Sequence, residues 1–178
     1  MLDEAGKKSD KRNYTVVQIN NSSDKSTIEV FHWLEKFKNE NIMIRTIVSY
    51  GDCKDEVIKE GVRIFGEKFE YLENYLNPQD YAFYISNSDI LILNQNRQQG
   101  VGNTKAFLYL KKKVFIRSDV STYNYLYSNN IHIDDTLEIK NMSFDDFIKN
   151  DYADVNKACV DKYFDLKLLS ETWAKAFV

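Results

Sequence analysis

The sequence predicts an α/β fold with a doubly wound parallel sheet, and three observations predict it. From Tyr14 onward, short β-branched or apolar segments alternate with segments whose apolar residues recur at helical spacing. One segment, DILIL at residues 89–93, is almost wholly apolar, which is typical of a strand buried on both faces of a parallel sheet. A chain of 178 residues with 43% hydrophobic residues is also large enough to enclose one substantial core.

The first two strand and helix units follow directly from the residue pattern. The first expected strand covers residues 14–20 and stops in the turn formers NNSSDKS before a helix over residues 28–37. The second expected strand covers residues 42–48, and the loop SYGD leads from it to a helix over residues 56–65. Gly66 closes that helix.

The rest of the chain continues the alternation. A third strand is expected at residues 69–72, and Asn77 as N-cap before Pro78 predicts the next helix. Ser143 followed by Asp146 predicts another helix start. Further strands are expected at 89–93, 113–116 and 131–133, and further helices at 102–110, 121–128 and 155–177.

Five or six strands separated by helices imply an open, Rossmann-like parallel sheet with helices on both faces. We expect residues 14–178 to form this one domain. Residues 1–13 are polar and aperiodic, as in a flexible leader or the remains of an interdomain linker.

Composition excludes several classes of function. The chain has 24 Lys and Arg against 27 Asp and Glu, and its net charge of -3 argues against nucleic acid as a partner. The two cysteines, Cys53 and Cys159, lie far apart and fit reduced thiols better than a disulfide framework. No apolar run approaches the roughly 20 residues that span a bilayer, and the N-terminus lacks the apolar core of a signal peptide. The sequence thus favours a cytoplasmic protein that touches a membrane at most peripherally.

The loops that follow strands are the places to search for a site, because ligands of such sheets bind beyond the carboxyl ends of the strands. The most informative loop is NQNRQQGVGNT at residues 94–104, which places Gly100 and Gly102 before a helix. Amides at a helix N-terminus attract anions, and Arg97 can neutralise a diphosphate while Asn103 and Thr104 donate or cap. An ordinary turn that needs two glycines explains the same pattern.

The loop after the first strand offers a second set of polar groups. Asn21, Ser22, Ser23 and Asp24 stand directly before a helix, where hydroxyls and amides can hold phosphate or sugar oxygens. The simpler reading is that one of them caps the helix.

Other candidate residues are better explained by structure than by chemistry. His32 and His132 lack partners at metal-ligand spacing, and His132 is expected inside a strand. Tyrosines spaced as on a helix, Tyr123, Tyr125 and Tyr127, can stack a base or a sugar but are more typical of a core. The run at 111–113 either compensates a helix dipole or faces anionic lipid.

Several nucleotide and metal motifs are absent from the sequence. We find no Walker loop, no GxSxG and no Asp-x-Asp pair, and we therefore predict no metal site and no cofactor. Any phosphate must then be bound by amides and side chains.

Five features together carry a family likeness. They are NSSD at 21–24, SYGD at 49–52, the spacing through Phe65 and Gly66, the DILIL strand and, above all, NRQQGVGN at 96–103. In order and spacing they resemble the 4-alpha-L-fucosyltransferases, glycosyltransferase family 56, over about residues 14–134. Members of that family transfer 4-acetamido-4,6-dideoxygalactose from thymidine diphosphate (TDP) to a diphosphate-linked lipid precursor of a bacterial surface polysaccharide.

The resemblance implies the C-terminal half of a GT-B fold and an inverting, metal-independent transfer. It implies that the 21–24 loop and the loop formed by Ser49, Tyr50 and Gly51 border the nucleotide-diphosphate sugar. It further implies that Arg97, Gln98, Gln99, Gly102 and Asn103 surround the diphosphate and the sugar. It assigns no catalytic residue.

The sequence departs from the family in two ways. The NSSDKSTIEV loop is shorter than the family's and lacks a His after its Asp, and a second domain for the lipid-linked glycan acceptor is missing. The chain is then expected to be an excised domain or a degenerate protein that stands alone. A rival reading is a non-catalytic α/β binding or interaction module. A receiver domain does not fit, because the first strand ends in Asn20, Asn21 and Ser22 instead of acidic residues.

Overall fold

A computed structural model describes residues 2, 12–21, 25–49, 53–163 and 170. Its strands are β1 (Thr15–Asn20), β2 (Ile42–Ile47), β3 (Phe69–Leu72), β4 (Ile90–Leu93), β5 (Lys113–Ile116) and β6 (Asp134–Asp135). Its α-helices are α2 (Ser26–Leu34), α3 (Lys54–Phe65), α4 (Pro78–Ser86), α5 (Val101–Tyr109), α6 (Ser121–Ser128), α7 (Phe144–Ile148) and α8 (Ala153–Tyr163). Three 3-10 helices complete the set, η1 (Glu35–Phe37), η2 (Gly66–Lys68) and η3 (Thr136–Asn141).

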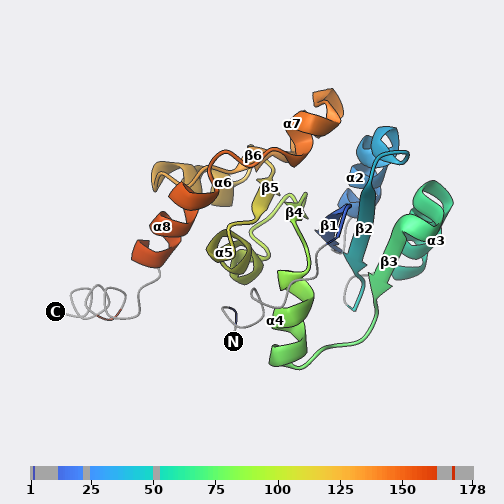
Figure 1. Cartoon of the computed structure of the whole chain (residues 1–178), viewed down its shortest axis with the longest axis horizontal. Helices are drawn as coiled ribbons and strands as arrows, with labels where there is room; N and C mark the ends of the chain where they lie inside the picture. The colour runs from blue at the N-terminus through green and yellow to red at the C-terminus, as the bar shows by residue number, and fades with distance from the viewer. Residues whose placement is uncertain (1, 3–11, 22–24, 50–52, 164–169, 171–178) are drawn as a thin grey trace.

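The six strands form one sheet in the order β3-β2-β1-β4-β5-β6, with each neighbouring pair parallel. In this sheet β1 lies between β2 and β4, with Val17 opposite Ile44 on one side and Ile90 on the other. The chain therefore builds outward from β1 to β3 and then returns to add β4, β5 and β6 on the other side (Figure 1). This confirms the doubly wound parallel α/β fold.

Successive side chains of the strands point to opposite faces of the sheet, and each face has its own hydrophobic core. Side chains at even positions of β4 and odd positions of β5, such as Ile92 and Phe115, face a core formed with α2, α3, η3 and α7. Phe31 of α2 stands at its centre and packs edge-on against Phe65 and Phe69, with ring centroids 5.8 and 5.5 Å apart. Fully buried aromatic pairs of this kind stabilise a core beyond the area that they bury.

The second core lies on the opposite face of the sheet. Leu91 and Leu93 of β4 and Val114 and Ile116 of β5 point to this face, which α4, α5, α6 and α8 cover. The strand β4 is thus buried on both sides, as its apolar sequence predicts. Because both faces of the sheet are covered around β4, ligands can approach its backbone only from the ends of the strand.

The sequence placed most elements within a residue or two, and two helix starts are confirmed in detail. Asn77 caps α4 by accepting from Gln79 N and Asp80 N at 3.0 and 2.9 Å. Ser143 caps α7, with Asp146 N donating to its hydroxyl at 3.2 Å. The expected tail helix is present as α8, and the rest of it, from residue 164 on, lies outside the described residues apart from residue 170.

One expected strand was wrong. Residues 131–133 do not pair with the sheet, and the last strand is Asp134–Asp135, opposite Phe115 and Ile116. The apolar pattern misled because Ile131 and Ile133 pack into the second core without joining the ladder. The main chain of His132 is held instead by Asn156 of α8, which accepts from His132 N and donates to His132 O at 2.8 Å each.

Candidate functional site

The sheet reverses its order between β1 and β4, and the loops that follow these two strands meet at that point. Gln95 Nε2 donates to Asn20 O at 2.8 Å, and Asn94 Nδ2 donates to Ser26 O at 3.2 Å. The two contacts join the loop after β4 to the end of β1 and to the start of α2. Parallel sheets of this topology bind ligands in the crevice at such a reversal, so this edge is the candidate site.

The first turn of α5 stands at this edge with its backbone amides available to an anion. Gly100 is the N-cap residue, has a φ of 72° and offers no side-chain cap. Its carbonyl accepts from Thr104 N at 2.9 Å and from Thr104 Oγ1 at 3.1 Å, which fixes the direction of the helix. The expected helix start near Gly102 is thus confirmed, one residue earlier at Val101. Uncapped amides and the helix dipole together make an anion site.

The two glycines of this loop differ in surroundings. A Cβ on Gly100 would lie 3.0 Å from Leu93 Cδ1 and would also sit in the left-handed region, which side chains disfavour. A Cβ on Gly102 would meet no described atom within 4 Å. Gly100 is therefore needed for the turn, whereas Gly102 leaves open space beside the first turn of α5.

Asn103 is held in place by α4. Tyr81 OH donates to Asn103 Oδ1 at 2.8 Å, so that Nδ2 is the atom with which Asn103 can donate to a ligand. Burial raises the pKa of Tyr81, and the hydrogen bond to Asn103 partly offsets this rise. The phenol therefore stays protonated and keeps Asn103 oriented.

A buried amide at the end of β1 has a hydrogen bond still to make. Asn20 is 1% exposed, and its Oδ1 accepts from Gln18 Nε2 at 3.1 Å. No described residue accepts a hydrogen bond from Asn20 Nδ2. A buried donor left unpaired costs about 1 to 3 kcal/mol, and such groups are rare unless a ligand or water satisfies them. Asn20 is therefore a candidate site residue, although the sequence pattern indicated only that it ends a strand.

Arg97, Gln98 and Gln99 form the outer part of the loop. Arg97 and Gln98 are exposed, Gln99 is half-buried, and Arg97 Nε donates to Gln99 Oε1 at 3.2 Å. The structure thus brings the whole predicted set from Arg97 to Thr104 to one edge of the sheet, beside the α5 N-terminus.

The loops after β1 and β2 are described only in part. Asn21 is fully buried, and its Oδ1 accepts a hydrogen bond from Thr27 Oγ1 at 3.1 Å. This buried contact joins the loop after β1 to α2. Ser49 follows β2 and is half-buried. The other predicted residues of these loops lie outside the described residues: Ser22, Ser23, Asp24, Tyr50 and Gly51.

A cation that the sequence analysis did not consider also stands at this edge. Arg117, directly after β5, donates from Nε and Nη2 to the two carboxylate oxygens of Asp119 at 2.9 and 2.6 Å. This fork lowers the pKa of Asp119, and the charges of Glu29 and Asp135 add to the field on Arg117. These carboxylates lie close enough to Arg117 to offset part of its charge.

Asn94 connects the loop after β4 to α2 and to η3 by hydrogen bonds. Its Nδ2 donates to Glu29 Oε2 at 2.9 Å, and its Oδ1 accepts from Thr136 Oγ1 at 3.0 Å. A polar pair, Asn94 and Gln95, directly after a wholly apolar strand was the signal in the sequence that could have identified these residues.

The remaining candidates from the sequence have structural surroundings. His32 Nε2 lies 2.7 Å from Glu60 Oε1, and His132 stacks on Tyr152 with ring centroids 4.1 Å apart. Cys53 and Cys159 are both free thiols. No group of three or more metal-ligating side chains is found among the residues that the structure describes.

One expectation about the surface is corrected. Tyr125 and Tyr127 are not core residues, since they are 59% and 66% exposed, whereas Leu126 between them is buried in the second core. Two lysines of the 111–113 run make hydrogen bonds within the protein. Lys112 Nζ donates to Ser86 O at 3.0 Å, and Lys113 is buried with Nζ donating to Lys149 O at 2.7 Å. None of the described helices is long and apolar enough to cross a bilayer.

No protein-family model and no curated protein matches the sequence. The structure is similar to the C-terminal domain of the glycosyl transferase group 1 family protein LpcC from Francisella tularensis, with a TM-score of 0.65 and 9% identity over 86% of this chain and 87% of that one. A glycosyltransferase from Rickettsia africae gives a TM-score of 0.66 and 15% identity over 99% of this chain. An α,α-trehalose-phosphate synthase (UDP-forming) from Burkholderia vietnamiensis gives a TM-score of 0.65 and 11% identity over 99% of this chain.

The chain spans about half the length of the last two proteins, 50% and 46%. At such low identities the similarity establishes the fold alone. Together with the parallel order β3-β2-β1-β4-β5-β6, it shows that the chain has the Rossmann-like α/β fold of the C-terminal domains of GT-B glycosyltransferases.

Proposed function

We propose that this chain is the domain of a glycosyltransferase that binds the nucleotide-diphosphate sugar. In finer terms, the donor is TDP-linked 4-acetamido-4,6-dideoxygalactose, as the resemblance of NRQQGVGN to the 4-alpha-L-fucosyltransferases implies. The acceptor is a lipid-linked glycan that a separate N-terminal domain holds, which brings the full enzyme to the inner face of the cytoplasmic membrane as a peripheral protein.

The observation that carries this proposal is the uncapped N-terminus of α5 at the reversal between β1 and β4. Gly100 turns the chain there without a side chain, and the amides that follow form a positive end of a helix. Asn20 Nδ2 adds a buried donor without a partner among the described residues, at the end of the neighbouring strand. An anion with several acceptor oxygens would satisfy both features.

The chemistry of transfer requires such a site. When the glycosidic bond breaks, the leaving nucleoside diphosphate gains negative charge, and donors aimed at it stabilise the transition state. The amides of α5 and the guanidinium of Arg97 would supply this stabilisation. Each charge-assisted hydrogen bond contributes about 1.5 to 3 kcal/mol. The general base for the acceptor hydroxyl would come from the other domain.

Calorimetric titration of the chain with TDP and with UDP, in EDTA and in magnesium, tests the proposal. We expect weak binding of TDP that magnesium does not strengthen, and no transfer or hydrolysis of a TDP-sugar by this chain alone. The absence of heat and of a thermal shift with both nucleotides at millimolar concentration would refute donor binding. Such a result would favour the rival reading, a non-catalytic interaction module.

A further inference from the structure

A pocket of about 420 Å³ lies between α5 and α6 and is distinct from the amides at the tip of α5. One wall is the face of α5 that carries Val101, Thr104, Lys105 and Leu108, whose positions match the i, i+3, i+4, i+7 pattern of one helix face. Gln98, from the loop before α5, also lines the pocket. The pocket therefore adjoins the place proposed for the diphosphate, and its volume is within the range of small-molecule sites.

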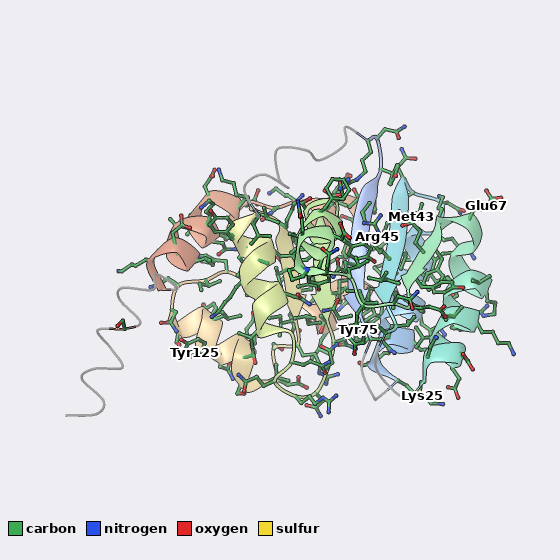
Figure 2. All side chains as sticks on the ribbon, turned by 90° about the horizontal axis from the view of Figure 1, so that it is seen from below. Lys25, Met43, Arg45, Glu67, Tyr75 and Tyr125 are labelled. Carbon is green, nitrogen blue, oxygen red and sulfur yellow. The ribbon has the colours of Figure 1, made fainter. Side chains whose placement is uncertain are left out.

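The other wall comes from α6 and has two unused recognition groups. Tyr125 lines the pocket with a side chain that is 59% exposed (Figure 2). Thr122 lines it as well, and its Oγ1 is buried without a hydrogen-bond partner among the described residues. An exposed aromatic ring beside an unpaired buried hydroxyl is unusual for a surface that binds nothing.

The composition of the pocket indicates the class of ligand. Val101, Leu108 and Leu126 give the pocket apolar surface, Thr122 and Gln98 add hydrogen-bonding groups, and Lys105 adds one cation, while none of the described lining residues is a carboxylate. A neutral ring with one apolar face and several hydroxyls matches this arrangement, because the ring of a tyrosine can pack on the apolar face while hydroxyls and amides bind the edge.

We propose that the pocket between α5 and α6 binds a pyranose ring of the glycosyl substrates, with Tyr125 stacking on the ring and Thr122 Oγ1 bonding to one of its hydroxyls. The proposal rests on the proposed function and deepens it. The pyranose is either the sugar of the donor, tethered to the diphosphate at α5, or a sugar of the acceptor glycan.

The test measures the affinity of the chain and its variants for TDP, TDP-glucose and free N-acetylglucosamine, by calorimetry and by saturation-transfer NMR. Tyr125→Ala and Thr122→Val should each weaken sugar binding, by roughly threefold to tenfold, and leave TDP binding within about twofold. Tyr125→Phe keeps the ring and should retain the affinity. Tyr75→Ala is the matched control, because Tyr75 is 82% exposed and lies in the connection from β3 to α4 (Figure 2). Thermal melts establish that each variant folds.

The pattern of losses identifies the source of the ring. If only TDP-glucose is weakened, the pocket holds the donor sugar, and if only N-acetylglucosamine is weakened, it holds a sugar of the acceptor. The proposal is overturned if Tyr125→Ala and Thr122→Val leave the affinities for TDP-glucose and N-acetylglucosamine unchanged. It is also overturned if these variants weaken the binding of TDP as much as that of TDP-glucose, because the nucleoside would then occupy the pocket. If TDP does not bind the parent chain, the proposed function fails, and the binding of a sugar in the pocket is then tested by the N-acetylglucosamine measurement alone.

Discussion

At the scale of single residues, Gly100 and Gly102 have different roles although they stand two positions apart. Gly100 supplies a left-handed turn against Leu93, and Gly102 keeps the space beside the first turn of α5 free. The sequence showed that both glycines precede a helix but not which one the backbone needs, because that depends on φ and on the packing of Leu93.

Substituting the two glycines should separate stability from binding. Gly102→Val should block TDP binding because a branched side chain would occupy the space over the amides, while the thermal midpoint changes little. Gly100→Ala should lower the stability by about 1 to 3 kcal/mol, since its Cβ meets both a positive φ and Leu93. Denaturant melts and TDP titrations of both variants check this. If Gly102→Val bound TDP as tightly as the parent, the diphosphate would not lie over this turn.

Arg97 should contribute charge to the same site. Arg97→Ala is expected to weaken TDP binding roughly tenfold to a hundredfold, the range that the loss of one charge-assisted contact implies. Arg63→Ala is the control, because Arg63 is also exposed but belongs to α3 and pairs with Glu60. Calorimetry on both variants compares them. Equal affinities would show that Arg97 makes no contact with the nucleotide.

At the scale of elements, the alternation of apolar strands and helical segments was sufficient to predict the order and the approximate bounds of most elements. The pattern failed at residues 131–133, where apolar side chains enter a core without forming a strand. It also failed for the exposed tyrosines of α6. Periodicity identifies residues that share a face, but the neighbouring elements determine which face is covered.

Helix α3 packs closely on β3 through Gly61. A Cβ at this position would lie 2.3 Å from Phe69 Cζ, and the Phe69 ring is itself held against Phe31. Gly61→Ala should therefore destabilise the fold by about 1 to 3 kcal/mol through overpacking, despite the better helix propensity of alanine. Val62→Ala, at an exposed position of the same helix, should change the stability little. Chemical denaturation measures both, and a Gly61→Ala variant as stable as the parent would contradict this packing.

Glu60 of α3 is hydrogen-bonded to Arg63 of the same helix and to His32 of α2. Hydrogen bonds from Arg63 and then from His32 lower the pKa of Glu60 to about 2 from an ordinary value of 4.5. A lowered folded-state pKa stabilises the fold above the unfolded value of 4.5, and this contribution fades as the pH falls towards 2. Glu60→Gln should thus melt earlier than the parent near neutral pH, with a gap that closes in acid. A gap that did not depend on pH would assign the effect to packing.

At the scale of the whole molecule, the fold was more predictable than the site. The alternation of strands and helices predicted a doubly wound parallel sheet, which the structure confirms, whereas the order of the strands is known only from the structure. The site required knowledge of which loops meet, and only the structure places Asn20, Asn94 and Thr136 beside the loop before α5. The hydrogen bond between Thr27 and the buried Asn21 was likewise not indicated by the local pattern.

The central claim is that a nucleoside diphosphate binds over the N-terminus of α5, and amide NMR of the labelled chain during titration with TDP tests it most directly. The account predicts the largest shifts for the backbone amides of Val101, Gly102 and Asn103 and for the side-chain amide of Asn20. A second pocket, lined by Arg12, Arg45 and Tyr84 on the side of the sheet near α4, is the internal comparison. Shifts confined to that pocket, with the α5 amides unmoved, would contradict the account.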